Sequence, residues 1–313
     1  MHDPTNSTNH LRAAQGDARL SPSRSTEAHL PAGVGKTGQP DFMALLHEAL
    51  TQPGRVSECY RMFHSYSLSN ALWIAGQLWA RGEALSPIAS FHRWKELGRV
   101  VKKGSKALAM SMPVTVKAKA DAKSADANPG TEDEGRRVIF VVRRNWFALH
   151  HTEPMEGAEP QTLETQTPEW NAERALAALE ITREPFEHYN GNVQGYALPN
   201  ERRVAVSPLA VNPAKTLFHE IAHCLLHSEQ ARIEDAAELT QSLAEVEAES
   251  VAYLCCAVLD LPGLEESRGY VQGWLARSGC NAEQFTDQHA RRVLGAVDKI
   301  LKAGKPATTE TED

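Results

Sequence analysis

The chain has 313 residues, of which 42% are hydrophobic and 23% are charged, and its formal net charge is -7. This composition is close to the globular average, so it excludes a wholly disordered chain and a collagen-like repeat. The longest strongly apolar run, Val251 to Leu259, is far shorter than the roughly 20 residues that a membrane span needs. The N-terminal residues lack the apolar segment of a secretory signal, and the five cysteines show no CxxC spacing. We therefore expect a cytoplasmic protein with reduced thiols.

Charge is distributed unevenly along the chain. From Asp41 to Lys117 there are ten Lys and Arg residues against five Asp and Glu residues, whereas from Glu153 onwards there are 13 basic and 27 acidic residues. The basic half is suited to a polyanionic partner, and the acidic half would repel one. At about 100–200 residues per domain, the length predicts two folded units with linkers.

Stretches rich in small and polar residues divide the chain, because such stretches bury too little apolar surface to offset the entropy of ordering. We predict a disordered tail at 1–40, a first domain at 41–150 with a disordered loop at 118–135, a linker at 151–168, a second domain at 169–303 and a disordered tail at 304–313.

Apolar periodicity predicts the elements between these breaks. In chain order they are helices at 42–50, 57–64 and 69–79; strands at 107–117 and 136–149 that pair across the loop; a helix at 168–180; strands at 182–188, 192–198 and 203–206; and helices at 213–228, 236–259, 265–278 and 282–302. Helices and paired strands in the first unit, and strands followed by helices in the second, predict an α+β protein of two domains.

The sharpest motif is HEIAH at 219–223, inside a mostly apolar stretch with helical spacing. Residues four apart share a helix face, so His219 and His223 can hold one cation while Glu220 points into the adjacent site. Two neutral imidazoles suit Zn²⁺, and a nearby carboxylate can take a proton from the water that the ion binds. The alternative is a structural HExxH on a surface helix.

A catalytic zinc needs a third protein ligand. His227 lies eight residues after His219 with no glycine between them, so the metzincin spacing is not met and we expect His227 to be a polar residue at the helix end. The downstream helix resembles that of glutamate-type zincins, which implies Glu245 as the third ligand and Glu249 as the acid that orients a ligand histidine. The reverse assignment and a solvated acidic helix face are the alternatives.

The first unit combines aromatic and basic side chains, as single-stranded nucleic-acid binders do. Gly98 and Gly104 in WKELGRVVKKGSKAL allow tight turns that would present lysines to phosphates. The candidate DNA-binding residues are Trp94, Lys95, Arg99, Lys102, Lys103 and Lys106. The alternatives are that Trp94 mainly packs in the core and that the basic surface is solvated without a ligand.

Two separate motifs occur together in this chain. FHSYSLSNALWIAGQ and FHRWKELGRVVKKGSKALAMSMP, followed by HEIAHCLLH and EVEAESVAYLCC, resemble the ArdC antirestriction family over roughly 41–303, outside the loop at 118–135. The chain departs from the family pattern in NWFALHHTE, where relatives resemble VFDVSQT, and at Ala244, where relatives have Glu.

The resemblance implies an N-terminal domain that binds single-stranded DNA and a C-terminal zincin-like metallopeptidase domain, as in proteins carried on conjugative plasmids and other mobile elements. It implies Zn²⁺ on His219, His223 and Glu245, with Glu220 as general base and then proton donor. The expected function is protection of incoming DNA from restriction, with a possible protein or peptide substrate and no membrane partner. A DNA-binding protein with a structural or inactive zinc site and a regulatory zincin that cuts a repressor are the alternatives.

Overall fold

The computed structural model describes residues 39–117, 136–163, 166–187, 193–235, 240–265 and 285–306. The predicted loop at 118–135, the predicted helix at 265–278 beyond its first residue, and nearly all of both predicted tails lie outside these ranges. Among the helices described, none combines the length and the hydropathy that a bilayer crossing requires.

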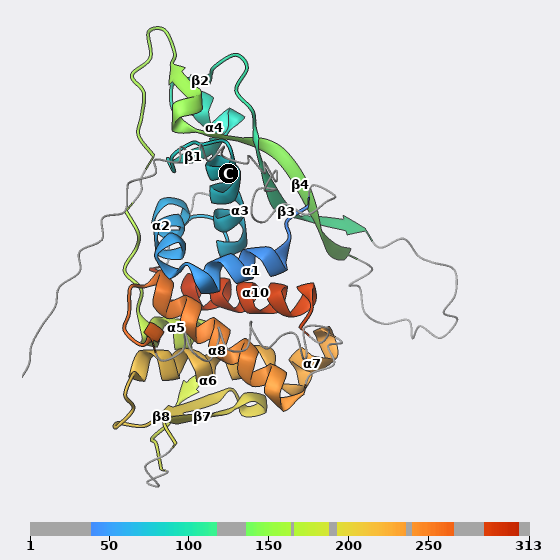
Figure 1. Ribbon diagram of the computed structural model, residues 1–313, viewed down its shortest axis with the longest axis vertical. Helices are drawn as coiled ribbons and strands as arrows, with labels where there is room; N and C mark the ends of the chain where they lie inside the picture. The colour runs from blue at the N-terminus through green and yellow to red at the C-terminus, as the bar shows by residue number, and fades with distance from the viewer. Residues whose placement is uncertain are drawn as a thin grey trace, which may run out of the picture.

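The described elements alternate helices with short strands and one long hairpin (Figure 1). In chain order they are α1 (Phe42–Thr51), α2 (Pro53–Phe63), α3 (Leu68–Ala80), β1 (Ile88–Ser90), α4 (Phe91–Glu96), β2 (Arg99–Val101), β3 (Leu108–Lys117), β4 (Arg136–Ala148), the 3₁₀ turn η1 (Leu149–His151), β5 (Thr152–Pro154), α5 (Ala172–Ala178), β6 (Thr182–Arg183), β7 (Gly195–Leu198), the 3₁₀ turn η2 (Pro199–Glu201), β8 (Arg203–Val206), α6 (Pro213–Leu226), α7 (Glu229–Asp235), α8 (Gln241–Val258) and α10 (Asp287–Ala303).

Most predicted elements are present in the described residues, with shifted ends. The two strands predicted at 107–117 and 136–149 are confirmed as β3 and β4, which pair antiparallel. Helix α2 begins at Pro53, ahead of the predicted start, because proline is tolerated at the first helical position, where its missing N–H has no partner to lose. The beginning of the predicted linker is structured, since Thr152–Pro154 forms strand β5 against β2.

Helix α3 covers the free edge of the first sheet, whose strand order is β1-β4-β3. Asn70 donates to the carbonyl of Ser111 at 2.9 Å and accepts from its N–H at 2.9 Å. Gln77, two helical turns along, forms the same pair of bonds with Ala109 at 2.9 and 2.8 Å. The two side-chain amides therefore take the place of a neighbouring strand and protect the edge of β3.

The helices of the two predicted units share one hydrophobic core. Figure 1 shows α1, α2 and α3 stacked on α10 and α8, with α6 and the strands β7 and β8 beneath them. One continuous buried cluster includes Phe63, Trp73, Phe218, Tyr253 and Ile300, which come from both sides of the predicted linker. Strand β2 and helix α4 lie at one end of the long axis, and α6 lies toward the other.

Helix α10 joins these layers through buried polar contacts as well. Asp298 accepts the N–H of Leu68, the first residue of α3, and lies near Lys305. Burial raises the pKa of Asp298 to about 7, and this N–H and the charge of Lys305 oppose the rise. A buried carboxylate therefore lies at the junction between α10 and the N-terminal helices.

We predict that Asp298→Asn removes part of the pH dependence of stability. Because the folded pKa of Asp298 lies above its unfolded value, the folded chain binds this proton more tightly, and its stabilising contribution is lost as pH rises from about 4 to about 7. The free energy of unfolding of the wild type should fall relative to the variant by on the order of 2 kcal/mol between pH 5 and pH 8. Urea denaturation at both pH values measures this. Asp287→Asn on the same helix is the control, and identical pH dependence in wild type and Asp298→Asn would contradict the prediction.

Candidate metal centre and basic surface

Helix α6 carries the HEIAH motif and packs against α8. Helix α6 begins at Pro213, which occupies the first helical position. Helix α8 is capped by Thr240, whose hydroxyl accepts the N–H of Leu243 at 3.3 Å. The apolar face of α6, with Phe218, Ile221 and Ala222, is buried in the core. The opposite side of that helix is thereby held facing the acidic residues of α8.

Three side chains from these helices converge on one point. The Nε2 atom of His219 lies 3.4 Å from Oε2 of Glu245, and the Nε2 atom of His223 lies 3.6 Å from Oε1 of the same carboxylate. The two Nε2 atoms are 3.1 Å apart. Two imidazole nitrogens and one carboxylate form a group that could hold a divalent metal ion. The four-residue spacing predicted that the two histidines share one face, and the resemblance to glutamate-type zincins implied Glu245 as their partner. The packing of α6 on α8 brings the Glu245 carboxylate to both histidines.

Glu249, a second acidic residue of α8, contacts His219 on the side of the ring away from Glu245. Oε2 of Glu249 lies 3.4 Å from Nδ1 of His219, the ring nitrogen that does not face Glu245. The other oxygen of Glu249 forms an ion pair with Lys215 at 2.8 Å. Lys215 was not among the predicted site residues, although its place one helical turn before His219 was a signal for a contact on this face.

The electrostatics of the group follow from its burial and its mixed charges. Burial disfavours the protonated form of His219, but the hydrogen bonds to Glu245 and Glu249 outweigh it and raise the pKa of His219 to about 9. Burial lowers the pKa of His223 to about 4, and the neighbouring imidazoles add to this. The hydrogen bond to His219 lowers the pKa of Glu245. The group therefore provides an ionised carboxylate and at least one neutral imidazole.

Glu220 lies beside this group and lines a pocket. Burial raises the pKa of Glu220 to about 7, which is suited to proton transfer near neutrality. The pocket has a volume of about 380 Å³ and is lined also by Val193, Val211, Lys215 and Thr216. Strand β7 closes one side of it, and a Cβ atom at Gly195 would lie only 2.9 Å from Oε1 of Glu220. A glycine at this position is what lets the strand approach Glu220, a role that the sequence reasoning missed.

The predicted DNA-binding residues divide into exposed and buried ones. Lys95, Lys102, Lys103 and Lys106 are exposed on α4 and on the loop after β2. Arg99 is half-buried and donates from Nε to the hydroxyl of Thr152 at 2.7 Å. The glycine prediction is confirmed, because Gly98 and Gly104 have φ of 70° and 88°, in the left-handed region.

The structure corrects the interpretation of Trp94 as a base-stacking residue. Its side chain is 1% exposed and packs with Ala89 and Leu97 in a small second core. Its Nε1–H donates to the carbonyl of Phe147 at 2.8 Å. Both faces of the indole are covered by protein, so it cannot stack on a base while the domain is folded.

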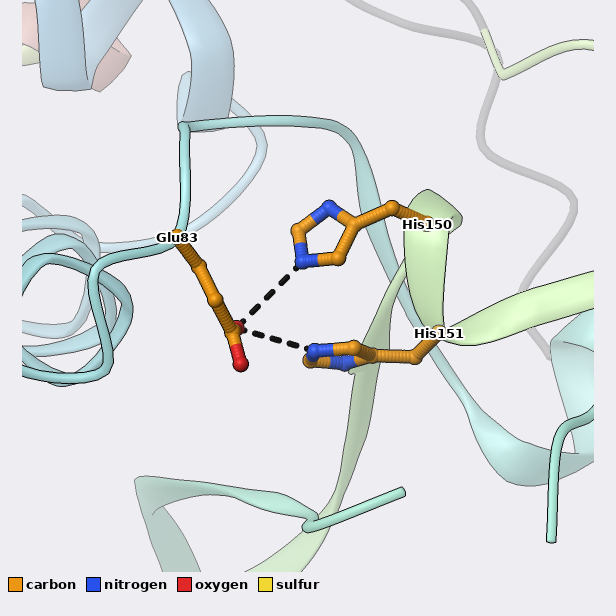
Figure 2. Close-up of side chains that lie close together, drawn as sticks. All are labelled: Glu83, His150 and His151. Atoms are coloured by element: carbon orange, nitrogen blue, oxygen red, sulfur yellow. Dashed lines mark hydrogen bonds and ion pairs between the residues drawn. The ribbon is translucent and has the colours of Figure 1, made fainter. Parts of the chain in front are cut away.

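A second group of potential ligands lies where the sequence reads NWFALHHTE. Figure 2 shows the Nε2 atoms of His150 and His151 directed at the carboxylate of Glu83, at 3.3 and 2.9 Å. The carbonyl oxygens of the same two histidines accept bonds from Lys102, at 3.0 Å from its Nζ and 2.9 Å from its backbone N–H. The two histidines therefore anchor the basic loop, the loop after β2 that carries Lys102, Lys103 and Lys106, to η1.

The hydrogen bonds of His151 decide against a metal in this second group. Its Nδ1 accepts the backbone N–H of Ala148 at 3.1 Å, so the ring proton is on Nε2 and is donated to Glu83. A metal ion on Nε2 would displace that proton to Nδ1. There it would point at the backbone N–H of Ala148, so that two donors would face each other. We interpret Glu83, His150 and His151 as a hydrogen-bonded group that stabilises the local fold.

Comparison with known proteins supports the family resemblance. Residues 48–147 match the family model described as the N-terminal domain of anti-restriction factor ArdC. Residues 48–147 are therefore ArdC-like. The matched residues run from the last turn of α1 to β4, include the loop after β2, and end before the HEIAH motif.

Two crystal structures of the antirestriction ArdC protein from the R388 plasmid are similar to this chain. The metal-free one is 16% identical and covers 84% of this chain and 94% of that chain, with a TM-score of 0.44. The Mn(II)-bound one is 15% identical and covers 86% of this chain and 99% of that chain, with a TM-score of 0.45. No curated protein matches the chain in sequence.

Proposed function

We propose that this ArdC-like chain is an antirestriction protein that binds single-stranded DNA through residues 41–150 and carries a zinc-dependent peptidase centre in residues 169–303. The match of residues 48–147 to the ArdC N-terminal domain supports the first part. The convergence of His219, His223 and Glu245 beside Glu220 supports the second, and it is the observation that carries the enzymatic proposal.

The DNA surface that we propose is formed by the exposed lysines around the loop after β2. Lys102 and Lys103 precede Gly104, whose positive φ turns the chain sharply. Both side chains are exposed, and Nζ of Lys102 also donates to the carbonyl of His150. The carbonyls of His150 and His151 hold the loop, so its cations are presented from an anchored backbone. Trp94 supports this surface from beneath and does not contact bases.

We expect charge reversal of Lys102 and Lys103 to weaken binding of single-stranded DNA of any sequence. Each neutralised phosphate releases condensed counterions, so the slope of log K against log salt should become shallower by about 0.7 for each phosphate that the variant no longer neutralises. Gel shifts or fluorescence anisotropy across a salt series, on single- and double-stranded oligonucleotides, measure this. Arg174→Glu, an exposed cation on α5, is the control. An unchanged salt slope would place the DNA elsewhere, and a wild type without salt-dependent affinity would favour a protein-docking role for this unit.

The residues of the metal centre fit Zn²⁺, because two imidazoles and a carboxylate are the donor set of many catalytic zinc sites. When bound, the ion would supply a Lewis acid that polarises a peptide carbonyl and acidifies water. Glu245 would serve as the third ligand, and the contact of Glu249 with Nδ1 of His219 would leave Nε2 of that ring available to the ion.

The protein's own groups would then carry the proton through hydrolysis. Glu220 takes the proton of the attacking water and delivers it to the nitrogen of the leaving amine, a role suited to a carboxylate with a pKa of about 7. The adjoining pocket accepts the peptide against β7, whose approach depends on Gly195. Val193 and Val211 offer apolar contact to a side chain of that peptide.

Glu220→Gln tests the peptidase proposal directly. The variant removes the proton acceptor but leaves the ligand set, so it should retain one equivalent of zinc and lose cleavage of casein by at least about 100-fold. Metal content and digestion are measured on the same preparation, with Glu201→Gln, an exposed residue of η2, as the control. Normal metal content with no Glu220-dependent cleavage would favour a DNA-binding protein with a structural zinc site.

A further inference from the structure

A row of polar side chains extends from the metal centre into the core. Nδ1 of His223, the ring nitrogen opposite its ligand atom, lies 2.8 Å from Nδ1 of His227. Nε2 of His227 lies 3.0 Å from Oε2 of Glu247. The side chain of His227 is 7% exposed and that of Glu247 is wholly buried. The sequence placed His227 at the helix end and left Glu247 out of the site, but their side chains meet behind His223.

Arg292 of α10 completes this row. Its Nε donates to Oε1 of Glu247 at 3.0 Å and its Nη2 donates to Oε2 at 3.4 Å. The same Nη2 donates to the carbonyl of Leu226, the last residue of α6, at 2.6 Å. The guanidinium therefore neutralises the buried carboxylate and ties it to the end of the helix that carries the metal ligands.

The donors and acceptors in this row have one consistent arrangement when the ligand atom of His223 is free. If Nε2 of His223 offers its lone pair to a cation, its proton is on Nδ1 and is donated to Nδ1 of His227. The proton of His227 must then be on Nε2, from which it is donated to Glu247. Arg292, which is always protonated, keeps Glu247 as the acceptor at the end of the row.

We infer that His227, Glu247 and Arg292 form a positioning relay that holds the ring and the tautomer of His223 for metal binding. The relay rests on the proposed metal centre and adds to it residues that touch neither metal nor substrate. Glu249 performs the same task for His219 through a direct carboxylate contact. For His223 the carboxylate is one imidazole further away, so an arginine on a third helix becomes part of the support of the metal site.

Stabilisation of the fold alone explains these buried contacts less well than support of the metal ligand His223 does. Buried ion pairs such as Glu247 with Arg292 are often no more stabilising than apolar residues of the same volume, because desolvation offsets the attraction. Partners of this kind around metal ligands commonly matter for affinity, and their loss weakens binding by about 10- to 100-fold. The relay therefore predicts a defect in metal binding that exceeds any loss of fold.

Two substitutions at His227 separate hydrogen bonding from packing. His227→Phe keeps a ring of similar size but can neither accept from His223 nor donate to Glu247. His227→Gln keeps both functions, because its carboxamide oxygen accepts and its NH₂ donates. The full chain is titrated with Zn²⁺ against a chelator and with Co²⁺, whose visible absorption reports ligand geometry. Thermal unfolding in EDTA measures the fold separately.

We expect His227→Phe to bind Zn²⁺ about 10- to 100-fold more weakly, with an altered Co²⁺ spectrum, and His227→Gln to stay within about threefold of the wild type. Wild-type affinity in His227→Phe, or equal losses in both variants, would overturn the relay. If His227→Phe does not fold, the ¹⁵N shifts of the wild-type imidazoles decide: a proton on Nε2 of His227 supports the relay and a proton on Nδ1 overturns it.

The same measurements distinguish failure of the relay from failure of the proposed function. A wild type that takes up neither ion overturns both. Metal binding that depends on His227 as expected, without cleavage that depends on Glu220, leaves the relay in place and removes the peptidase activity.

Discussion

His219→Ala is expected to abolish stoichiometric metal binding by the chain. The substitution removes the nitrogen at 3.4 Å from Glu245, so two donors at most remain from the converging group. Since loss of an outer partner alone weakens metal sites by about 10- to 100-fold, loss of a ligand should weaken this one by more than about 100-fold. Metal analysis after dialysis should show one equivalent in the wild type and almost none in the variant.

The fold should survive this change well enough for the comparison to be made. His219 is half-buried on the side of α6 that faces the acids of α8, and the opposite face of the helix holds the core contacts. Added Zn²⁺ should raise the melting temperature of the wild type, because the ion binds only the folded chain, and should leave that of the variant unchanged. His92→Ala, which removes an exposed imidazole from α4, is the control for nonspecific binding. A variant that keeps its equivalent of metal would contradict the proposed ligand set.

Trp94→Ala is expected to destabilise the chain by about 3–5 kcal/mol, the usual cost of deleting a fully buried indole. The cavity would open between α4 and β4, and the carbonyl of Phe147 would lose its donor. Urea denaturation followed by circular dichroism measures the free energy of unfolding. This effect on stability distinguishes a core tryptophan from a base-stacking one.

Two further variants make the test specific. Trp94→Phe keeps most of the apolar contact but loses the hydrogen bond, so it should cost less than the alanine substitution. Phe91→Ala removes a neighbouring aromatic side chain that is 41% exposed, and it should change stability by well under the amount for Trp94. If Trp94→Ala unfolded like the wild type and weakened only DNA binding, the corrected role of this residue would be wrong.

The sequence by itself determined the local features. The four-residue spacing of His219 and His223 defined one helix face, because that spacing matches the helical period. The alternating strands around the loop predicted the β3–β4 hairpin, and Gly98 and Gly104 marked turns that need a positive φ. Each of these features depends on residues close together in the chain.

Only the tertiary structure decided what meets across the chain. Glu245 and Glu249 share a helix face in any sequence reading, and the packing of α8 on α6 gives them different partners. Trp94 was a candidate DNA-binding residue with core packing as the alternative, and its contact with β4, some fifty residues later in the chain, decides for packing. Glu247 had no assigned role in the sequence analysis, and its partner Arg292 comes from α10. Helical and strand periods specify which face a side chain occupies, whereas the group opposite that face is set by long-range packing of the core.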